Sequence, residues 1–321
     1  MDRVSLAVGG PSVGRIGLGC MGMTHAYDPQ GRDEDSALAV LRQAQTLGVT
    51  LIDTADVYGP YTNEELVGRA LKLMDRATVT VATKVGLVLD DDTDGKPTYS
   101  NNARPEHIRA SVDASLRRLG LDHIDLYQLH RVNPDVPLEE TWGALAETVR
   151  QGKVRHLGLS EVTPAQISAA AAVHPVTSVQ SELSLWTRDA LPEVLPYCRA
   201  HEIAFLAYAP LGRGFLTGRF TRADDLPQHD QRRHMPRFQK QQFDANLALV
   251  DTVTALAQRY ERTPAEVALA WITAQGPRVI PIPGTKSLRN LRTNARAGDL
   301  HLSDSDLKVL DDLPAAQGSR T

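Results

Sequence analysis

Short apolar runs alternate with longer amphipathic segments along most of the chain. We count eight such runs, and most are almost continuously apolar, which is typical of parallel strands buried on both faces. The segments between them carry apolar residues at helical spacing. The strands predicted from this pattern cover residues 15–19, 50–53, 78–84, 123–129, 154–160, 176–180, 203–208 and 279–282.

Several of the amphipathic segments also carry residues that begin or end helices. Residues 33–47 have apolar side chains at helical spacing, and Gly48 follows as a stop signal. Pro105 opens a second segment, and Thr163 before Pro164 is a typical cap for a third. The chain is therefore predicted to alternate strands with helices.

An eightfold alternation of strand and helix predicts a parallel sheet covered by helices. A closed (β/α)8 barrel, the TIM barrel, satisfies this count without leaving sheet edges, and a doubly wound open sheet is the alternative. Such a barrel commonly takes about 250 residues or more, so residues 1–321 are predicted to form a single domain. Residues 4–13, with glycine and proline at their centre, predict an N-terminal β-hairpin that plugs the bottom of the barrel.

One long segment, residues 210–242, falls outside the strand and helix pattern and is rich in Gly, Arg and Gln. Structureless loops of this length are usually functional or disordered. Its early glycines, Gly212 and Gly214, would let the backbone approach a pyrophosphate closely. The arginines that follow fit either a mobile arm that closes over phosphates or a plain solvated loop.

Composition excludes several classes of protein. Lys and Arg number 35 against 39 Asp and Glu, a net charge of −4, which argues against a dedicated nucleic-acid binder. No apolar stretch approaches the roughly 20 residues of a membrane span, and no signal peptide opens the chain, so we expect a cytoplasmic protein. The two cysteines, Cys20 and Cys198, are expected to be reduced and buried. No metal is expected, and the sequence makes no prediction of oligomeric state.

Candidate catalytic residues stand at the ends of the early strands, where a barrel places its active site. Asp53 ends the second predicted strand and Tyr58 follows it, Lys84 ends the third, and His130 follows the fourth. Each alone has a structural explanation, such as a cap, packing or a solvated tip. Together they are harder to explain this way, because a lysine that ends a buried strand needs a carboxylate partner. Asp53 is the candidate partner.

This set of side chains suits proton donation by a phenol. A free tyrosine has a pKa near 10, and an adjacent ammonium group lowers that pKa toward working pH. We therefore expect Lys84 to tune Tyr58, while Asp53 holds Lys84 charged. His130 would aim a substrate carbonyl by a hydrogen bond.

The later strand ends carry hydrogen-bonding and aromatic groups instead of charged ones. Ser160, Gln180 and Tyr208 suit a planar ring that bears a carboxamide. The last strand leads through Gly284, Thr285 and Lys286 into a helix, and the amides at a helix N-terminus favour a phosphate. Asn290, Thr293 and Asn294 fall on one face of that helix.

In these segments the chain resembles the aldo-keto reductases, which are NAD(P)H-dependent (β/α)8 barrels. Glu161 after Ser160, together with residues 184–186 and 211–214, is closest to a microbial and plant branch that includes perakine-reductase-like enzymes. The matching segments are residues 52–59, 83–86, 126–130, 158–160, 208–212 and 282–285.

The resemblance implies NADPH-dependent reduction of aldehydes and ketones to alcohols by direct hydride transfer. Asp53, Tyr58, Lys84 and His130 would form the catalytic tetrad, with Tyr58 as general acid. Ser160 and Gln180 would hold the nicotinamide carboxamide, and Tyr208 would stack on the ring. The residues implied to bind the cofactor are Gly22, Met23, Ser160, Gln180, Tyr208, Leu211, Gly212, Arg213, Gly284, Thr285, Lys286, Asn290 and Asn294.

Two positions depart from the family pattern. Many members have Asn where this chain has Glu161, so one carboxamide contact must be remade or supplied by the carboxyl group. Many also place Arg where this chain has Asn290, which leaves the preference for NADPH resting mainly on Lys286 and Thr285.

The expected substrate is a small carbonyl compound, and no nucleic-acid or membrane partner is expected. Its pocket is predicted to be lined by Met23, Tyr27, Val57 and Trp186, apolar walls that favour aldehydes over highly charged sugars. Trp186 could equally anchor the core or a loop. Two other functions stay open: a Schiff-base aldolase that uses Lys84, and a cofactor-binding redox sensor or regulatory subunit.

Overall fold

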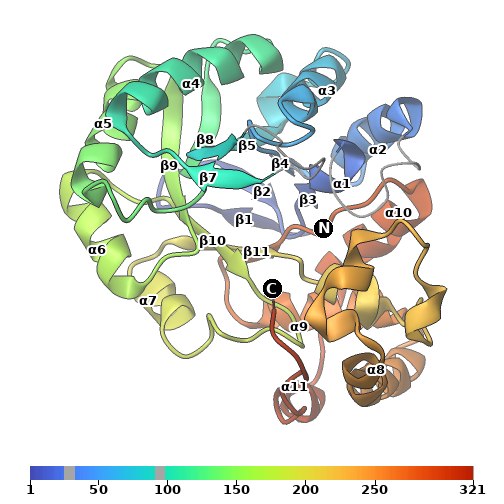
Figure 1. Ribbon diagram of the computed structural model, residues 1–321. Coiled ribbons are helices and arrows are strands. Elements are labelled where there is room, and N and C mark those ends of the chain that lie inside the picture. Colours follow the sequence, from blue (N-terminus) through green and yellow to red (C-terminus); the bar gives the residue numbers. More distant parts are fainter. Residues whose placement is uncertain (25–32, 91–97, 321) are drawn as a thin grey trace.

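A parallel sheet of eight strands forms the centre of the protein (Figure 1), in a computed structural model that describes residues 1–24, 33–90 and 98–320. The strand order is β12-β11-β10-β9-β8-β5-β4-β3, so each strand neighbours the next central strand in the chain. The strands are β3 (Leu18–Gly19), β4 (Leu51–Asp53), β5 (Thr80–Val85), β8 (Ile124–Leu129), β9 (Val154–Ser160), β10 (Ser178–Glu182), β11 (Ala204–Tyr208) and β12 (Val279–Pro281).

The first and last strands of this sheet meet and close it into a barrel. The Gly17 amide donates to the Pro281 carbonyl at 2.9 Å, and the Gly19 amide donates to the Pro283 carbonyl at 3.3 Å. A Cβ atom on Gly19 would lie only 2.8 Å from the Ile282 carbonyl oxygen, so the seam requires glycine there. The prediction of a (β/α)8 barrel is confirmed, and the doubly wound open sheet is excluded.

Helices surround the barrel, and their ends follow the signals in the sequence. Asp33 caps α2 by accepting from the Ser36 amide at 3.2 Å, and Thr163 forms a capping box with Gln166 at the start of α6. None of the described helices combines the length and hydropathy needed to cross a membrane. The helices are α1 (Met21–Thr24), α2 (Glu34–Thr46), α3 (Thr62–Leu71), α4 (Pro105–Leu119), α5 (Leu138–Arg150), α6 (Pro164–Val173), α7 (Val194–Ala200), α8 (Lys240–Arg259), α9 (Pro264–Ala274), α10 (Leu288–Arg296) and α11 (Asp304–Asp311).

The N-terminal hairpin closes one end of the barrel, as the sequence predicts. Strands β1 (Arg3–Ser5) and β2 (Ser12–Gly14) pair antiparallel with Val4 opposite Val13. Both valines and Leu6 are buried against inward-facing barrel residues, among them Leu51, Ala82, Leu126, Leu206 and Ile280. The apolar plug leaves the other end, where the strands finish, as the open mouth.

The same inward-facing rows change from apolar to polar as the strands approach the mouth. Because successive side chains on a strand point to opposite faces, residues two apart share the barrel interior. Along each strand, an apolar inward-facing residue is followed by a polar one nearer the mouth: Leu51 by Asp53, Ala82 by Lys84, and Leu126 by Gln128. The floor of the site is therefore hydrophobic core, while its polar groups lie one layer above.

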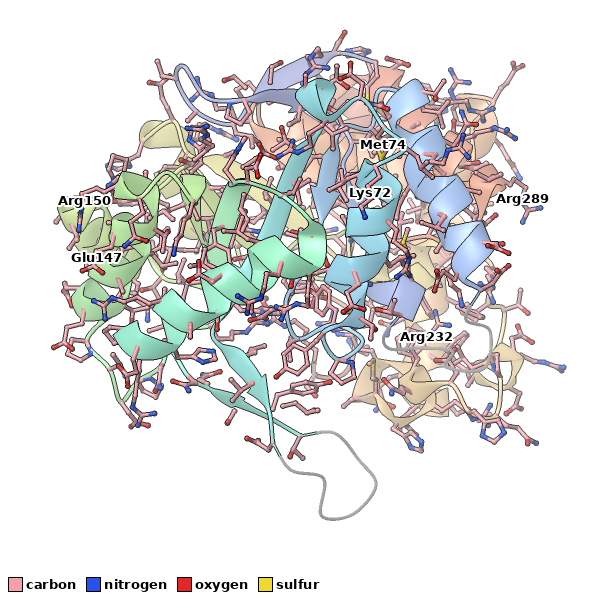
Figure 2. All side chains as sticks on the ribbon, turned by 90° about the horizontal axis from the view of Figure 1, so that it is seen from above. Lys72, Met74, Glu147, Arg150, Arg232 and Arg289 are labelled. Atoms are coloured by element: carbon pink, nitrogen blue, oxygen red, sulfur yellow. The ribbon has the colours of Figure 1, made fainter. Side chains whose placement is uncertain are left out.

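Two details at the mouth differ from the sequence-based expectations. The sixth barrel strand covers 178–182 instead of 176–180, so Glu182 ends the strand at the mouth. A second hairpin, β6 (Leu87–Leu89) with β7 (Tyr99–Asn101), was not predicted; these strands are only three residues long and partly exposed, and so carry little hydrophobic pattern. It projects from the end of the barrel opposite the N-terminal hairpin (Figure 2).

The segment 210–242, whose conformation the sequence does not predict, is ordered into short turns. Its four 3-10 helices cover Gly212–Thr217, Ala223–Asp225, Gln231–His234 and Pro236–Phe238. They enclose an apolar cluster, and two of the arginines fasten it: Arg232 pairs with buried Asp230 at 2.6 Å, and Arg237 donates to the Trp186 carbonyl at 3.0 Å. The buried members of the cluster are Trp186, Phe215, Phe220, Leu226, Phe238, Phe243, Leu249 and Val250.

Candidate active site

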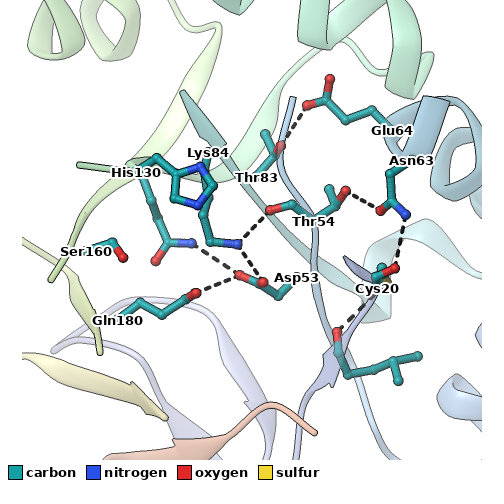
Figure 3. A network of polar contacts seen from close by, with 12 residues as sticks. Cys20, Asp53, Thr54, Asn63, Glu64, Thr83, Lys84, His130, Ser160 and Gln180 are labelled. Atoms are coloured by element: carbon teal, nitrogen blue, oxygen red, sulfur yellow. Dashed lines mark hydrogen bonds and ion pairs between the residues drawn. The ribbon is translucent and has the colours of Figure 1, made fainter. Parts of the chain in front are cut away.

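A buried ion pair between Lys84 and Asp53 lies at the centre of the mouth (Figure 3). The Lys84 ammonium donates to Asp53 Oδ1 at 2.6 Å and to the Thr54 carbonyl at 2.8 Å. Their side chains are only 1% and 5% exposed, which confirms that the strand-ending lysine has Asp53 as its partner. The other carboxylate oxygen, Oδ2, accepts from Gln180 Nε2 at 2.7 Å and from Gln128 Nε2 at 3.4 Å.

Lys84 stays charged in this environment. Burial alone would lower its pKa, but the Asp53 carboxylate and then Tyr58 act in the opposite direction, and the pKa is raised above its ordinary value. The mouth therefore contains a fixed ammonium group, held in place by hydrogen bonds on strands β4 and β5.

Tyr58 contacts this ammonium group. The two side chains hydrogen-bond, and Lys84 Nζ lies 5.2 Å from the centre of the tyrosine ring. Burial raises the pKa of Tyr58, and Lys84 opposes this shift without overcoming it. The expectation that Lys84 lowers this pKa below its ordinary value is therefore wrong for the protein alone. The phenol stays protonated at neutral pH, as a proton donor must be.

His130 stands beside Tyr58 as a neutral imidazole. Its ring meets the tyrosine ring edge to face, with 5.9 Å between centroids and 81° between planes. Burial, then the charges of Lys84 and Arg131, hold the pKa of His130 well below its ordinary value. Its Nδ1 atom is buried without a hydrogen-bond partner among the described residues. His130 can therefore donate one hydrogen bond without carrying a charge.

The loop that presents Tyr58 is held by buried polar groups that the sequence analysis missed. Thr54 Oγ1 donates to Asn63 Oδ1 at 2.6 Å, and Asn63 Nδ2 donates to the Cys20 carbonyl at 3.0 Å. The Asp56 amide donates to the Lys84 carbonyl at 3.2 Å. These bonds fix Tyr58 relative to strands β3 and β5. The signal for Asn63 was its place within the apolar face of a helix.

Ser160, Gln180 and Tyr208 lie together at the ends of adjacent strands, as the sequence predicts. Gln180 pairs with Ser160 across β10 and β9, and Ser160 is 1% exposed. Because Gln180 Nε2 is committed to Asp53 and no described residue donates to its carbonyl oxygen, that oxygen is a ready acceptor for an amide. Ser160 Oγ accepts from Arg131, which leaves its own hydrogen to donate. A hydroxyl donor and an amide acceptor side by side fit a carboxamide.

Glu161 does not offer a free carboxyl group to a carboxamide. One oxygen accepts from the Glu182 amide at 2.9 Å, and the other is held by the Arg320 guanidinium. Although burial would raise the pKa of Glu161, the hydrogen bonds from Arg320 and the Glu182 amide lower it, so the group is ionised. Arg320 also lies 3.5 Å from Glu182. The sequence analysis missed Arg320, because this partner comes from 159 positions away.

The segment that carries Arg320 follows α11 and ends at the C-terminus (Figure 1). Several hydrogen bonds anchor it. Arg188 donates to the carbonyls of Leu310 and Asp311, at 2.8 and 2.7 Å. Asn246 exchanges two hydrogen bonds with the Gln317 backbone, at 3.1 and 2.8 Å. The segment is thereby fixed across the mouth, with the Arg320 side chain beside the strand ends of β9 and β10.

The segment predicted to contact the pyrophosphate has an unusual backbone. Gly212, Arg213 and Gly214 have positive φ angles of 54°, 55° and 93°. Glycine adopts such angles easily, whereas Arg213 does so only under strain, which is common at binding sites. Arg213 also lies 3.5 Å from Glu182, so its guanidinium is held beside the end of strand β10.

The remaining predicted cofactor contacts lie at the same end of the barrel. The side chain of Ser287 caps α10 at its N-terminus, directly after Gly284, Thr285 and Lys286. A Cβ on Gly22 would meet no atom of the described residues within 4 Å, while Met23 beside it is buried. Asn290 is exposed and Asn294 is buried on α10. These residues fit a nicotinamide dinucleotide, because carboxamide partners, an accessible glycine backbone and a helix N-terminus occur in one mouth.

The predicted substrate pocket remains a prediction. Met23 and Val57 are 3% exposed each, and Tyr27 lies outside the described residues. Trp186 is 4% exposed and packs against Phe215, 4.5 Å between ring centroids, directly under Gly212. The structure therefore favours the role of Trp186 as anchor of the 212–217 turn over that of a pocket wall.

Known proteins resemble this chain in sequence and in fold. The profile of the Aldo/keto reductase family matches residues 15–314. A probable aldo-keto reductase 1 from soybean, Glycine max, is 42% identical over 310 residues, 97% of this chain and 88% of that protein. The glycerol dehydrogenase of Gluconobacter oxydans superposes with a TM-score of 0.87 at 33% identity, over 97% of this chain and 94% of that one. A holo aldo-keto reductase from Bacillus halodurans superposes with a TM-score of 0.81 at 27% identity, over 99% and 98%.

Proposed function

The chain belongs to the aldo/keto reductase family, whose members are nicotinamide-dependent oxidoreductases, and we propose that it reduces aldehydes and ketones to alcohols with NADPH. The observation that carries the proposal is the contact between Tyr58 and the buried Lys84–Asp53 pair. A protonated phenol against a fixed cation is built to give a proton to a carbonyl oxygen as that oxygen becomes negative.

In such a reduction, each of the side chains at the mouth would have a separate role. The bound nicotinamide would supply hydride chemistry. Tyr58 gives the proton, and Lys84 stabilises the phenolate that remains. Asp53 holds Lys84 charged, and neutral His130 donates a hydrogen bond that orients the carbonyl oxygen. Ser160, Gln180 and Tyr208 place the ring, and the barrel floor below Asp53 excludes water.

The environment of Lys84 disfavours the Schiff-base aldolase. An attacking amine must be neutral, which requires a lowered pKa. Lys84 instead has a raised pKa and gives hydrogen bonds to Asp53, the Thr54 carbonyl and Tyr58. A redox sensor or regulatory subunit would use the same cofactor site, so only turnover separates it from a reductase.

A cofactor titration followed by an aldehyde tests the proposal. Trp186 lies under Gly212 in the predicted pyrophosphate turn, so the protein carries its own fluorescent reporter of binding. We expect NADPH to change tryptophan fluorescence at lower concentration than NADH, and 4-nitrobenzaldehyde then to consume the NADPH. Binding without consumption would favour the sensor, and absence of binding by either nucleotide would reject the proposal.

The pH dependence of reduction should lack an inflection near the ordinary pKa of histidine, because the pKa of His130 is held well below it. Tyr58 has a raised pKa, so its acid form persists through neutral pH and is lost only above the ordinary tyrosine value. We expect kcat for reduction to stay level across neutral pH and to fall at strongly alkaline pH. A kcat that halves between pH values near 6 and 7 would contradict these protonation states.

Lys286 is expected to select NADPH through its 2′-phosphate. Lys286→Met should weaken NADPH binding by roughly tenfold to a hundredfold, the effect of losing one charge-assisted hydrogen bond, and change NADH binding little. Fluorescence titration measures both. Lys308→Met is the matched control, because it removes the same charge from an exposed side chain of α11. Equal losses for both nucleotides would rule out contact with the 2′-phosphate.

Arg320 is expected to support cofactor binding through Glu161 and Glu182. Without it, a partly buried carboxylate directly after Ser160 loses its counterion, so Arg320→Met should weaken NADPH by about tenfold, with a smaller effect on kcat. Arg278→Met is the control. It breaks the ion pair between Glu202 and Arg278, the residue directly before strand β12. Adding Glu161→Gln should restore part of the affinity. An unchanged dissociation constant would show that Arg320 only fastens the chain.

A further inference from the structure

Arg131 is a cation at the mouth that the catalytic tetrad does not use. It follows His130 at the end of β8 and is half-buried. Its NH1 atom donates to the His130 carbonyl at 2.6 Å and to Ser160 Oγ at 3.1 Å. Arg131 is thus fixed between a predicted catalytic residue and a predicted nicotinamide contact, which places it beside the position of the reacting carbonyl.

The charge of Arg131 lacks a counterion in the described part of the chain. Other arginines at the mouth have carboxylate partners: Arg320 pairs with Glu161 and Glu182, and Arg213 pairs with Glu182. Arg131 forms no ion pair with a described carboxylate, and Glu161, the acidic group whose pKa it helps to lower, is already held by Arg320 and the Glu182 amide. A partly buried cation that has only neutral acceptors is stabilised further when a ligand supplies an anion.

The guanidinium group also has hydrogen-bonding capacity to spare. A guanidinium carries five N–H donors, and the bonds to described residues use NH1 alone. Nε and NH2 remain for a planar anion, and these two atoms form the fork that binds a carboxylate with two parallel hydrogen bonds. A lysine in the same place could not provide this geometry.

The phosphates of the cofactor are poorly placed to be that anion. Their predicted contacts follow β11 and β12, whereas Arg131 follows β8, three and four strands away in the order β12-β11-β10-β9-β8. In the closed barrel this is the opposite side of the mouth. On the side of Arg131 lie His130 and Tyr58, whose predicted partner is the substrate carbonyl. The missing anion is therefore expected on the substrate.

We propose that Arg131 binds a carboxylate carried by the substrate, so that the enzyme prefers aldehydes and ketones bearing a carboxylate over matched neutral ones. This inference rests on the proposed reductase function and adds a substrate class to it. It also revises the expectation from apolar pocket walls, because a fixed cation beside the reacting carbonyl favours an anionic substituent.

Two matched substrate pairs test the preference: 3- and 4-carboxybenzaldehyde, each against its methyl ester. The isomers place the carboxylate at different distances from the carbonyl, while the esters keep size and remove charge. For at least one isomer, we expect the acid to exceed its ester in kcat/KM by roughly tenfold or more, mainly through KM. Equal values for acid and ester with both isomers would overturn the proposal.

Variants of Arg131 distinguish its proposed role in binding the substrate carboxylate from a role in positioning Ser160. Arg131→Met should lower kcat/KM for the preferred acid by roughly tenfold to a hundredfold and change that for its ester by no more than about threefold. Arg131→Lys, which keeps the charge and loses the fork, should fall between. Arg117→Met removes the same net charge from an exposed position of α4, away from the mouth, and should leave kcat/KM for acid and ester unchanged. Equal losses for acid and ester in Arg131→Met, together with weaker NADPH binding, would make Arg131 a positioning residue only.

The proposed function fails in a different way. If the wild-type protein binds NADPH and reduces neither acid nor ester, reductase activity itself is in doubt. If it reduces the esters and shows no preference for the acids, the reductase stands and the carboxylate site is rejected.

Discussion

Replacing Tyr58 with phenylalanine is expected to remove carbonyl reduction and leave NADPH binding intact. The phenol of Tyr58 is protonated at neutral pH and hydrogen-bonded to the Lys84 ammonium, whereas Lys84 itself is bound to Asp53 and His130 is neutral. General acid catalysis by a positioned side chain contributes roughly a hundredfold to ten-thousandfold. We therefore expect kcat to fall within this range.

Steady-state rates with 4-nitrobenzaldehyde and fluorescence titration with NADPH measure the two effects separately. The ring of Tyr58 is retained in the variant, so its packing against His130 persists and the fold should be unaffected. Tyr197→Phe is the matched control, because Tyr197 in α7 stacks on His201, the residue that ends this helix, outside the mouth. A Tyr58→Phe protein with undiminished kcat would reject Tyr58 as the proton donor.

Lys84→Met is expected to remove both activity and much of the stability. The variant leaves the Asp53 carboxylate buried without its counterion, and breaking a buried ion pair in this way costs about 3–5 kcal/mol. Gln180 and Gln128 still donate to Asp53, which softens the loss but supplies no charge. Tyr58 would also lose the cation that stabilises its phenolate. Urea unfolding and kcat measure the two consequences.

A second substitution distinguishes the structural loss from the chemical one. Lys84→Met combined with Asp53→Asn removes both charges and keeps an oxygen that can accept from Gln180. We expect the double variant to regain most of the stability and none of the activity. Recovered activity in the double variant would mean that the charge of Lys84 is not needed for proton donation.

The barrel could be predicted from the sequence because its determinants are local. A buried parallel strand such as 204–208 is apolar almost along its whole length, and a cap such as Thr163 marks its helix without reference to the rest of the chain. The convergence of Asp53, Tyr58, Lys84 and His130 could be predicted for a similar reason. Strand ends of a barrel converge, so polar residues that end apolar runs meet even when they are far apart in the sequence.

The features that were missed depend on partners from distant parts of the chain. Arg320 contacts Glu161 because Arg188 and Asn246 fix the segment before it. The pattern of apolar residues in the sequence does not predict those contacts. The turns in 210–242 form around Trp186, which belongs to another loop. The raised pKa of Tyr58 likewise follows from how deeply it is buried, which the presence of a nearby lysine does not predict.

The most direct test of the account is transfer of deuterium from NADPH deuterated at both C4 positions of the nicotinamide to 4-nitrobenzaldehyde. The account predicts that the wild-type protein forms 4-nitrobenzyl alcohol carrying one deuterium on the former carbonyl carbon, and that Tyr58→Phe binds the same cofactor and forms almost none. Cofactor binding by the wild-type protein with no labelled alcohol would contradict the account and identify a binding protein instead of a reductase.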